Sequence, residues 1–539
     1  MDTKSLNGDQ ALAFGALDSG VKLVTSYPGS PSSGTVETLI EHAEQQNFYI
    51  EWSSNEKVAM EMGIGASIAG RRALVCTKSV GLNAMIDPLM ALNLTPVHGG
   101  LVILLGDDPG GYGSQNDQDS RPLASFLEIP MLEPSYPSEG YAMMREAFNA
   151  SELYKTPLII RHTRAFTLQN EPVKIREKDY QNINHGLLKE SFRFVPVPSN
   201  VVEKHKDLHK RLEAFGNWSE NIPFNRSYGF GKEGIIGAGF AFQKLQDVLG
   251  NSPPKEFKLL KLGVLYPLPK KVIADFLQEC RKVLIVEENE PYIEIQIKAI
   301  AHDIGCSTKI FGKLDKHIHR EGELYRWQIQ KALLSFFPEF ERKKNYSKND
   351  EEDERPEKEN FCAECGYIDI LDRLEAAAER LGQKTVLVGD PGCLVTVADR
   401  LDAKYAMGSA VGVADGLTKA GIEKKVVAIF GDSSFFHSSI PAICNVVHNR
   451  SSIMMVVLDN AATAASGFQP HPGVGRDAMG QKAPSSDIGQ IARACGVKHV
   501  FSTGSQNSSS DLEKIFHKAL ACRELCLVIV RIESKKQRT

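Results

Sequence analysis

The sequence lacks the features that would direct a chain to a membrane, to secretion or to nucleic acid. Its 539 residues contain no run of 18 apolar residues, and the start, MDTKSLNGDQ, has no basic segment leading into an apolar one. Lys and Arg number 63 against 67 Asp and Glu, so the formal charge of −4 offers no basic surplus for nucleic acid. We therefore expect a cytoplasmic protein, with neither a membrane nor nucleic acid as a partner.

Cysteine is also scarce. Ten cysteines in a chain of this length do not make a disulfide framework, and the close pairs are Cys362/Cys365 and Cys522/Cys526. In a reducing compartment the C-x-x-C spacing of Cys362 and Cys365 indicates metal or redox chemistry. The remaining composition, 42% hydrophobic and 24% charged, is that of a globular protein and excludes wholesale disorder.

The chain is long enough for three or four domains at about 150 residues each. Residues 343–360 are densely charged and almost free of apolar residues, which predicts a solvated linker. Elsewhere short apolar runs alternate with helix-length segments, the pattern of βαβ units. We predict an α/β protein with three doubly wound parallel-sheet domains: residues 1–175, residues 176–342 after an irregular polar excursion to about residue 230, and residues 361–539.

The strongest chemical signal lies at two strand ends in the last domain. The apolar run VVAIF stops at Gly431-Asp432-Ser433, and IMMVVL stops at Asp459-Asn460, after a gap of twenty-five residues from Ser434 to Leu458. In a doubly wound sheet, ligands collect outside the carboxyl ends of the strands. Asp432 and Asn460 supply oxygen ligands of the kind that Mg²⁺ prefers, and a backbone carbonyl just beyond Asn460 supplies a third. Each strand end taken alone would be read as a structural cap or turn.

Glycine and a helix start complete this predicted anion site. Gly431 lets the backbone approach phosphates, and the helix that begins near Ser434 offers free N–H groups. The pair of strand ends at this spacing matches the signature of thiamine diphosphate enzymes.

Several motifs then resemble one family, the indolepyruvate:ferredoxin oxidoreductase alpha subunits. GDSSFFHSSI, LDNAATAASGFQPHPG and MGSAVGVADGLTKAG resemble its diphosphate-binding domain. SYPGSPSS, EWSSNEKVAMEMGIGASIAG and DDPGGYGSQNDQDSR resemble its pyrimidine-binding domain, and EENEPYIEIQIK its transketolase C-terminal-like middle domain. The resemblance makes residues 1–175 the pyrimidine-binding domain and residues 361–539 the diphosphate- and Mg²⁺-binding domain. It implies cofactor contacts at Gly408, Gly431, Asp432, Ser433, Asn460 and Ala462, the last through its carbonyl.

The same resemblance assigns a catalytic residue and two substrate contacts. Glu56, which opens an apolar helix, takes the position of the carboxylate that activates thiamine through its aminopyrimidine ring; the alternative is an ordinary first-turn acid. Ser30, in the turn after the first strand, and Arg121 are implied substrate contacts. The planar fork of Arg121 suits the carboxylate of a 2-oxo acid. The alternative for Arg121 is a surface pair with Asp117 or Asp119.

The resemblance also bears on the cysteines. In the wider family a C-x-x-C and a later cysteine help to hold an iron–sulfur cluster, and Cys362, Cys365 and Cys393 fall at corresponding places. Four thiolates are usual, and Cys495 is only a positional guess for the fourth. The residues around the pair depart from the family pattern, so reduced thiols within the fold remain the alternative.

The function implied is the oxidative decarboxylation of an aryl 2-oxo acid, indolepyruvate-like, to an acyl-CoA, with electrons passed to ferredoxin. It would use thiamine diphosphate, Mg²⁺ and coenzyme A, with a [4Fe-4S] cluster, a smaller beta subunit and ferredoxin as expected partners in a dimer or heterotetramer. The sequence ends without the cysteine-rich extension common in the family. That difference motivates an alternative, a non-oxidative thiamine-dependent decarboxylase or carboligase; a degenerate scaffold subunit is a third reading.

Overall fold

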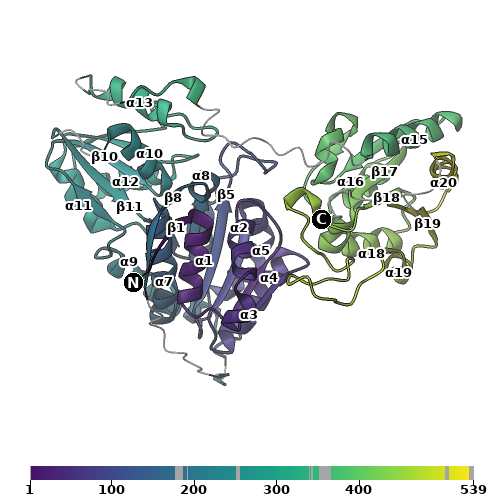
Figure 1. Cartoon of the computed structure of the whole chain (residues 1–539), viewed down its shortest axis with the longest axis horizontal. Helices are drawn as coiled ribbons and strands as arrows, with labels where there is room; N and C mark the ends of the chain where they lie inside the picture. Colours follow the sequence, from purple (N-terminus) through teal and green to yellow (C-terminus); the bar gives the residue numbers. More distant parts are fainter. Residues whose placement is uncertain are drawn as a thin grey trace. The chain divides into compact units, whose positions relative to one another are not determined.

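The structure is a computed structural model that describes residues 2–176, 186–187, 189–190, 192–250, 255–338, 340, 344–350, 366–503 and 509–532. The chain divides into two compact units, which are described separately (Figure 1). Unit 1 comprises Met1–Ile50 and Glu56–Lys358, and unit 2 comprises Glu51–Asn55 and Glu359–Thr539. The division at residue 358 falls within the predicted linker, of which residues 344–350 are described and contain the short turn η1 (Lys348–Asp350).

The first sheet of unit 1 has seven strands in the order β12-β6-β7-β5-β4-β2-β3. The pairings β2–β4, β4–β5, β5–β7 and β6–β7 are parallel, and β12 joins antiparallel to β6. The strands are β2 (Leu23–Ser26), β3 (Tyr49–Trp52), β4 (Ala73–Lys78), β5 (Leu101–Asp107), β6 (Met131–Leu132), β7 (Leu158–Thr163) and β12 (Val264–Tyr266). A separate antiparallel pair joins β1 (Asp2–Asn7) to β8 (Asn170–Ile175).

Helices connect these strands in the alternating manner that the sequence predicts. The central strands β4 and β5 are buried almost throughout, as expected for parallel strands covered on both faces. The helices are α1 (Gly8–Asp18), α2 (Ser33–Ile40), α3 (Ala43–Gln46), α4 (Glu56–Ile68), α5 (Ser79–Leu92), α6 (Arg121–Leu127), α7 (Pro137–Tyr154) and α8 (Arg164–Thr167).

A second sheet of unit 1 has the order β14-β13-β10-β11-β9, in which β9 alone is antiparallel to its neighbour. Its strands are β9 (Arg226–Tyr228), β10 (Glu233–Ala238), β11 (Phe257–Leu262), β13 (Lys282–Val286) and β14 (Lys309–Phe311). The helices around it are α10 (Phe240–Leu249), α11 (Lys270–Glu279), α12 (Tyr292–Asp303) and α13 (Arg326–Phe336).

Two details of unit 1 differ from the sequence prediction. The excursion up to residue 230 is not irregular throughout, because it contains the 19-residue helix α9 (Val201–Ser219), whose buried Leu208 and Phe215 lie seven residues apart on one face. The boundary at residue 175 also does not separate two compact bodies. Strand β12 belongs to the first sheet, and one hydrophobic core includes Val75 of the first sheet and Ile236 and Leu260 of the second.

Unit 2 contains a six-stranded, fully parallel sheet with the order β16-β15-β17-β18-β20-β19. Two core clusters cover its two faces, since alternate residues of β17 and β18 fall in one cluster or the other. The strands are β15 (Thr385–Gly389), β16 (Ala403–Lys404), β17 (Lys425–Gly431), β18 (Met454–Asp459), β19 (His499–Thr503) and β20 (Cys526–Arg531). The helices are α15 (Tyr367–Arg380), η2 (Cys393–Arg400), α16 (Ala410–Lys419), α17 (Asp432–Ser434), η3 (Phe435–Ser439), α18 (Ile440–His448), η4 (Ala464–Ser466), α19 (Ile488–Ala494) and α20 (Ser509–Ala521).

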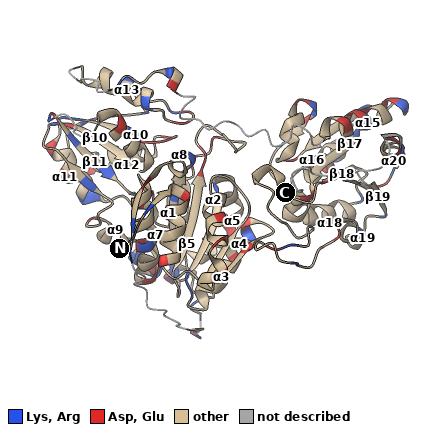
Figure 2. Cartoon of the chain, viewed as in Figure 1, with Lys and Arg blue, Asp and Glu red and all other residues tan. Residues whose placement is uncertain are grey.

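These three sheets confirm the predicted α/β class with parallel, doubly wound sheets. No helix among the described residues combines the length and apolar character needed to cross a bilayer. Basic and acidic residues are interspersed along the chain in each unit (Figure 2), in keeping with the near-neutral composition.

Two buried cations stabilise unit 1, one within the second sheet and its helices and one between the two sheets. Lys244 of α10 is fully buried, and its ammonium group donates to Glu288 and Glu323 at 2.9 Å each and to the carbonyl of Leu324 at 2.7 Å. Lys261 of β11 pairs with Glu139 of α7, which joins the second sheet to a helix of the first. Burial costs each charge its hydration, and these partners offset that cost.

We predict that Lys244→Met destabilises unit 1 by about 3–5 kcal/mol, because two buried carboxylates lose their cation. The measurement is the guanidinium chloride concentration at the midpoint of the unfolding transition of unit 1. Lys206→Met is the matched control, since Lys206 pairs with Glu203 on the exposed face of α9 and the midpoint should not move. Equal midpoints for both variants would contradict the prediction.

Candidate functional site

In unit 2 the strand order places a crevice at the carboxyl ends of β15 and β17. Strand β16 follows β15 on one side, whereas β17 lies on the other, so the winding direction reverses at β15. In open α/β sheets ligands bind at such a reversal. Both strands end in Gly-Asp: Gly389-Asp390 after β15 and Gly431-Asp432 after β17.

Asp432 is buried at the end of β17, 2% exposed, and opens α17. Its Oδ1 accepts the N–H of Ser433 at 2.9 Å, and its Oδ2 lies 3.0 Å from Nε2 of His471. The Nδ1 of His471 accepts the N–H of Gly473 at 3.1 Å, which assigns the ring proton to Nε2. His471 therefore donates to Asp432 and fixes the orientation of the carboxylate.

The neighbouring strand β18 brings a second carboxylate to the same place. Asp459 ends β18 beside Asp432; burial, followed by the charge of Asp432, raises the pKa of Asp459 to about 6. Asn460 is buried beside it, with its Oδ1 3.2 Å from the N–H of Ala462. Two carboxylates thus meet at this strand end, with an amide oxygen on the residue that follows, and hard oxygen donors of this kind fit Mg²⁺.

Gly408 occupies the turn on the β15 side of the crevice. Its φ is +79°, and a Cβ there would lie 2.5 Å from Cβ of Ser438, so no other residue fits without a shift. Asp390 holds this turn, because its carboxylate accepts the N–H groups of Gly408 at 2.7 Å and Ala410 at 2.8 Å. Burial raises the pKa of Asp390 to about 6.

The residues around this crevice also fit a diphosphate. Ser409 Oγ and Thr463 Oγ1 are buried and have no hydrogen-bond partner in the described part of the chain. Each lies one residue from a predicted cofactor contact, Gly408 or Ala462. A Cβ on Gly431 would touch nothing within 4 Å, so open space lies beside the strand end. A π-helical segment, η3, begins three residues after Asp432. Such segments are common near functional sites.

Unit 1 has a comparable crevice. Strand β3 lies on one side of β2 and β4 on the other, so the sheet reverses its winding at β2. The loop that carries Ser30 follows β2 and lies against the ends of the neighbouring strands: Ser32 donates to the carbonyl of Thr77 at 2.6 Å, and Ser33 accepts the N–H of Gly29 at 2.9 Å. Ser30 itself is half-buried at the turn before α2.

Glu56 is the first residue of α4 and is buried. A Cβ on Gly81 would lie 2.6 Å from Oε1 of Glu56, so the absence of a side chain at Gly81 makes room for the carboxylate beside α5. Burial lowers the pKa of Lys78, at the end of β4, whereas the charges of Asp108 and Glu56 raise it by a smaller amount. A carboxylate and an ammonium group thus lie near each other at the carboxyl edge of this sheet.

Arg121 requires a correction. It pairs with Asp119, the alternative to the predicted substrate contact, but the pair is buried and not on the surface: Arg121 is 1% exposed and its donors are used within the protein. Its guanidinium group binds Asp119 and, at 2.7 Å, Glu287, and it donates to the carbonyls of Glu288 and Glu290. The guanidinium group therefore has no free pair of N–H donors for a substrate carboxylate. The partners at residues 287–290 come from the segment after β13, which local sequence context around Arg121 does not reveal.

The predicted cluster ligands Cys362 and Cys365 lie outside the described residues. Cys393 begins η2, just after the carboxyl end of β15, and packs against the core on one face of the sheet. Cys495, the guess for a fourth ligand, packs against the opposite face beside Cys444, at the end of α19. Cys393 and Cys495 therefore do not converge on one cluster.

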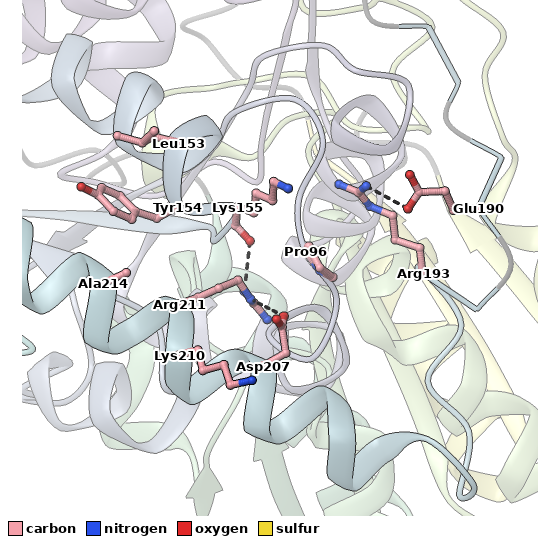
Figure 3. A pocket seen from close by; sticks show the side chains of 10 residues that line it. All are labelled: Pro96, Leu153, Tyr154, Lys155, Glu190, Arg193, Asp207, Lys210, Arg211 and Ala214. Atoms are coloured by element: carbon pink, nitrogen blue, oxygen red, sulfur yellow. Dashed lines mark hydrogen bonds and ion pairs between the residues drawn. The ribbon is translucent and has the colours of Figure 1, made fainter.

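Unit 1 has a cavity of about 370 Å³, and none of the residues that line it is a predicted site residue (Figure 3). Its guanidinium groups are paired within the protein: Arg211 with Asp207 at 2.9 Å and with the carbonyl of Lys155 at 3.0 Å, and Arg193 with Glu190 at 3.0 Å. We assign it no part in the reaction.

Sequence reasoning missed Asp390, His471 and Lys78. Asp390 carries the same signal as Asp432, a Gly-Asp pair that closes an apolar strand, and could have been found by that rule. Lys78 closes a strand in the same way. His471 lies 39 residues beyond Asp432 in a loop, and only the folded chain brings it there.

Two family models match the chain. Residues 14–205 match "Pyruvate flavodoxin/ferredoxin oxidoreductase, thiamine diP-bdg", and residues 401–530 match "Thiamine pyrophosphate enzyme, C-terminal TPP binding domain". A 2-oxoglutarate:ferredoxin oxidoreductase from Magnetococcus marinus has a TM-score of 0.47 and 15% identity, covering 62% of this chain and 65% of that one.

Curated relatives match almost the whole length. Subunits named "Indolepyruvate oxidoreductase subunit IorA" are 34% identical in Methanothermobacter marburgensis, covering 98% of this chain and 86% of the relative, and 34% identical in Pyrococcus abyssi, covering 98% and 85%. The Archaeoglobus fulgidus protein of that name is 30% identical, covering 92% and 81%. The chain therefore belongs to the indolepyruvate oxidoreductase alpha-subunit family, whose members are thiamine diphosphate-dependent 2-oxoacid oxidoreductases.

Proposed function

We propose that this chain is the thiamine-binding subunit of an enzyme that oxidatively decarboxylates an aryl 2-oxo acid to an acyl-CoA and passes the electrons to ferredoxin. The match over 98% of the chain to subunits named for indolepyruvate oxidation carries this proposal. A smaller second subunit completes the enzyme in this proposal, in keeping with the word "subunit" in the relatives' names.

The diphosphate and Mg²⁺ would be held by unit 2. Asp432, Asn460 and the carbonyl of Ala462 are the proposed metal ligands, with Asp459 close enough to share the positive charge. Gly408, Gly431 and Ser433 would line the phosphate side, and Ser409 and Thr463 offer hydroxyl groups that have no partner among the described residues. His471 orients Asp432 by its hydrogen bond.

In unit 1, Glu56 and Ser30 are the proposed contacts of the aminopyrimidine ring and of the substrate. Thiamine supplies the electron sink for the carbanion that loss of CO₂ would otherwise leave. Glu56 would accept a hydrogen bond from the aminopyrimidine ring and so control where its proton resides. Ser30 would contact the 2-oxo acid, and the Lys78 ammonium group, rather than Arg121, supplies positive charge at that edge.

Asp432→Ala should weaken thiamine diphosphate binding in the presence of Mg²⁺ by more than about 100-fold, since it removes a ligand and not merely an outer contact. Isothermal titration of the purified chain measures the affinity. Asp369→Ala, on the exposed face of α15 where Asp369 pairs with Arg373, is the control and should bind as the wild type does. Unchanged binding and turnover in Asp432→Ala would instead support a scaffold role.

Glu56→Gln should lower turnover by about 10²–10⁴-fold while cofactor affinity changes little, because the amide keeps the shape but loses the charge and basicity. Turnover is followed by acceptor reduction under single-turnover and steady-state conditions. Glu61→Gln lies on the same helix, half-exposed and paired with Lys57, and should be silent. A Glu56→Gln enzyme that retains the wild-type rate would rule out the assigned role.

The oxidative outcome is tested on the complex purified anaerobically with its partner subunit. With indolepyruvate or phenylpyruvate, coenzyme A and ferredoxin, we expect acyl-CoA formation coupled to ferredoxin reduction, with iron present and visible absorbance that bleaches on reduction. Aldehyde or acyloin product without iron and without acceptor reduction would establish the non-oxidative alternative. Cys393→Ser tests whether its thiolate is among the cluster ligands, by the iron content.

A further inference from the structure

Two histidines of α9 and a glutamate at the end of α6 converge on the surface of unit 1. His205 and His209 are four residues apart and lie on one side of the helix. Nε2 of His205 lies 2.8 Å from Oε2 of Glu128, and Nε2 of His209 lies 2.9 Å from Oε1 of the same carboxylate. The two imidazole centroids are 4.4 Å apart, so all three side chains face one point.

We propose that Glu128, His205 and His209 form a binding site for a divalent transition-metal cation of the zinc class. This site is separate from the cofactor residues and does not depend on the proposed function. Its candidate ligand atoms all lie within 4.8 Å of one another. Two imidazole nitrogens and one carboxylate form a donor set that zinc accepts in proteins, with water in the fourth position.

The distances allow a cation to enter with small movements. Ligand bonds of about 2.0–2.2 Å in a tetrahedron separate the ligand atoms by about 3.3–3.5 Å. The two Nε2···O distances of 2.8 and 2.9 Å would have to open by roughly half an ångström, within the reach of side-chain rotation. His205 is 48% and His209 60% exposed, so a hydrated ion has access.

The protonation of the site is also compatible with a metal. Without an ion, each neutral imidazole donates its Nε2 proton to Glu128. A bound cation takes both Nε2 lone pairs, so the protons move to Nδ1, where the half-exposed rings can donate to water. The carboxylate then binds the cation instead of accepting two hydrogen bonds.

Such a cation would attach α9 to the first sheet at a second point. The helix is already held by Arg211, which donates to the carbonyls of Asn93 and Lys155 at 2.8 and 3.0 Å. Glu128 ends α6 in a left-handed conformation, φ 52°, which fixes the direction from which its side chain reaches α9. The metal would join two segments that are 77 residues apart in the chain.

The test uses the full-length chain, saturated with thiamine diphosphate and Mg²⁺, and titrates Zn²⁺ against a chromophoric chelator. We expect His209→Gln to lose one zinc ion per chain, or to bind it more than about 100-fold more weakly, and Glu128→Gln to weaken it by about 10–100-fold. The wild type should also show a zinc-dependent rise in Tm that His209→Gln lacks. His302→Gln, a 92% exposed histidine of α12, is the matched control.

Zinc can also bind the chain's thiols, so the ligand type must be measured. X-ray absorption at the zinc edge should show nitrogen and oxygen ligands in the wild type for the ion that His209→Gln loses. Equal zinc stoichiometry and affinity in the wild type and in His209→Gln, with sulfur ligands only, would overturn the proposal. Equal Tm values without zinc exclude misfolding of the variant as the cause.

Discussion

The Arg121 guanidinium group holds unit 1 together, because it joins the first sheet to the segment after the central strands of the second. It binds Asp119 on its own side and Glu287 on the other. A cation buried this deeply is tolerated only when its partners are fixed around it, so residues 287–290 must keep their place relative to α6. The shared hydrophobic core and the pairing of β12 with β6 reinforce the same junction.

This junction fixes the position of the carboxyl edge of the first sheet relative to the strands and helices that pack against it. Glu133 follows β6, pairs with the buried Arg161, and accepts the N–H of Phe240 at 3.0 Å at the start of α10. The loop that carries Ser30 extends from β2, which has a neighbour on each side, whereas Glu56 follows the edge strand β3. Rigid strands with polar loops at one end are the usual basis for a site in parallel sheets.

In unit 2, polar residues also gather at the carboxyl ends of parallel strands, but the charges of these residues differ from those in unit 1. Its strand ends bring the carboxylates of Asp432 and Asp459 together, whereas the sheet of unit 1 places a carboxylate beside an ammonium group. Acidic groups that lie this close in a buried place repel one another, and a cation removes that repulsion. The acidic edge therefore suits a metal and its phosphates, and the mixed edge suits an organic ring and a small acid.

The sequence by itself determined the α/β class, the family and the strand ends at which polar residues gather, because strand periodicity and Gly-Asp endings are local patterns. It also indicated Glu56, Asp432 and Asn460 as candidates. It could not determine the ion pairs of Arg121 or the position of His471. These contacts depend on residues distant in the chain, such as Glu287 for Arg121. A buried ion pair produces no periodic pattern in the sequence around either partner. Only the folded chain decides which strand ends meet and which charges are already paired.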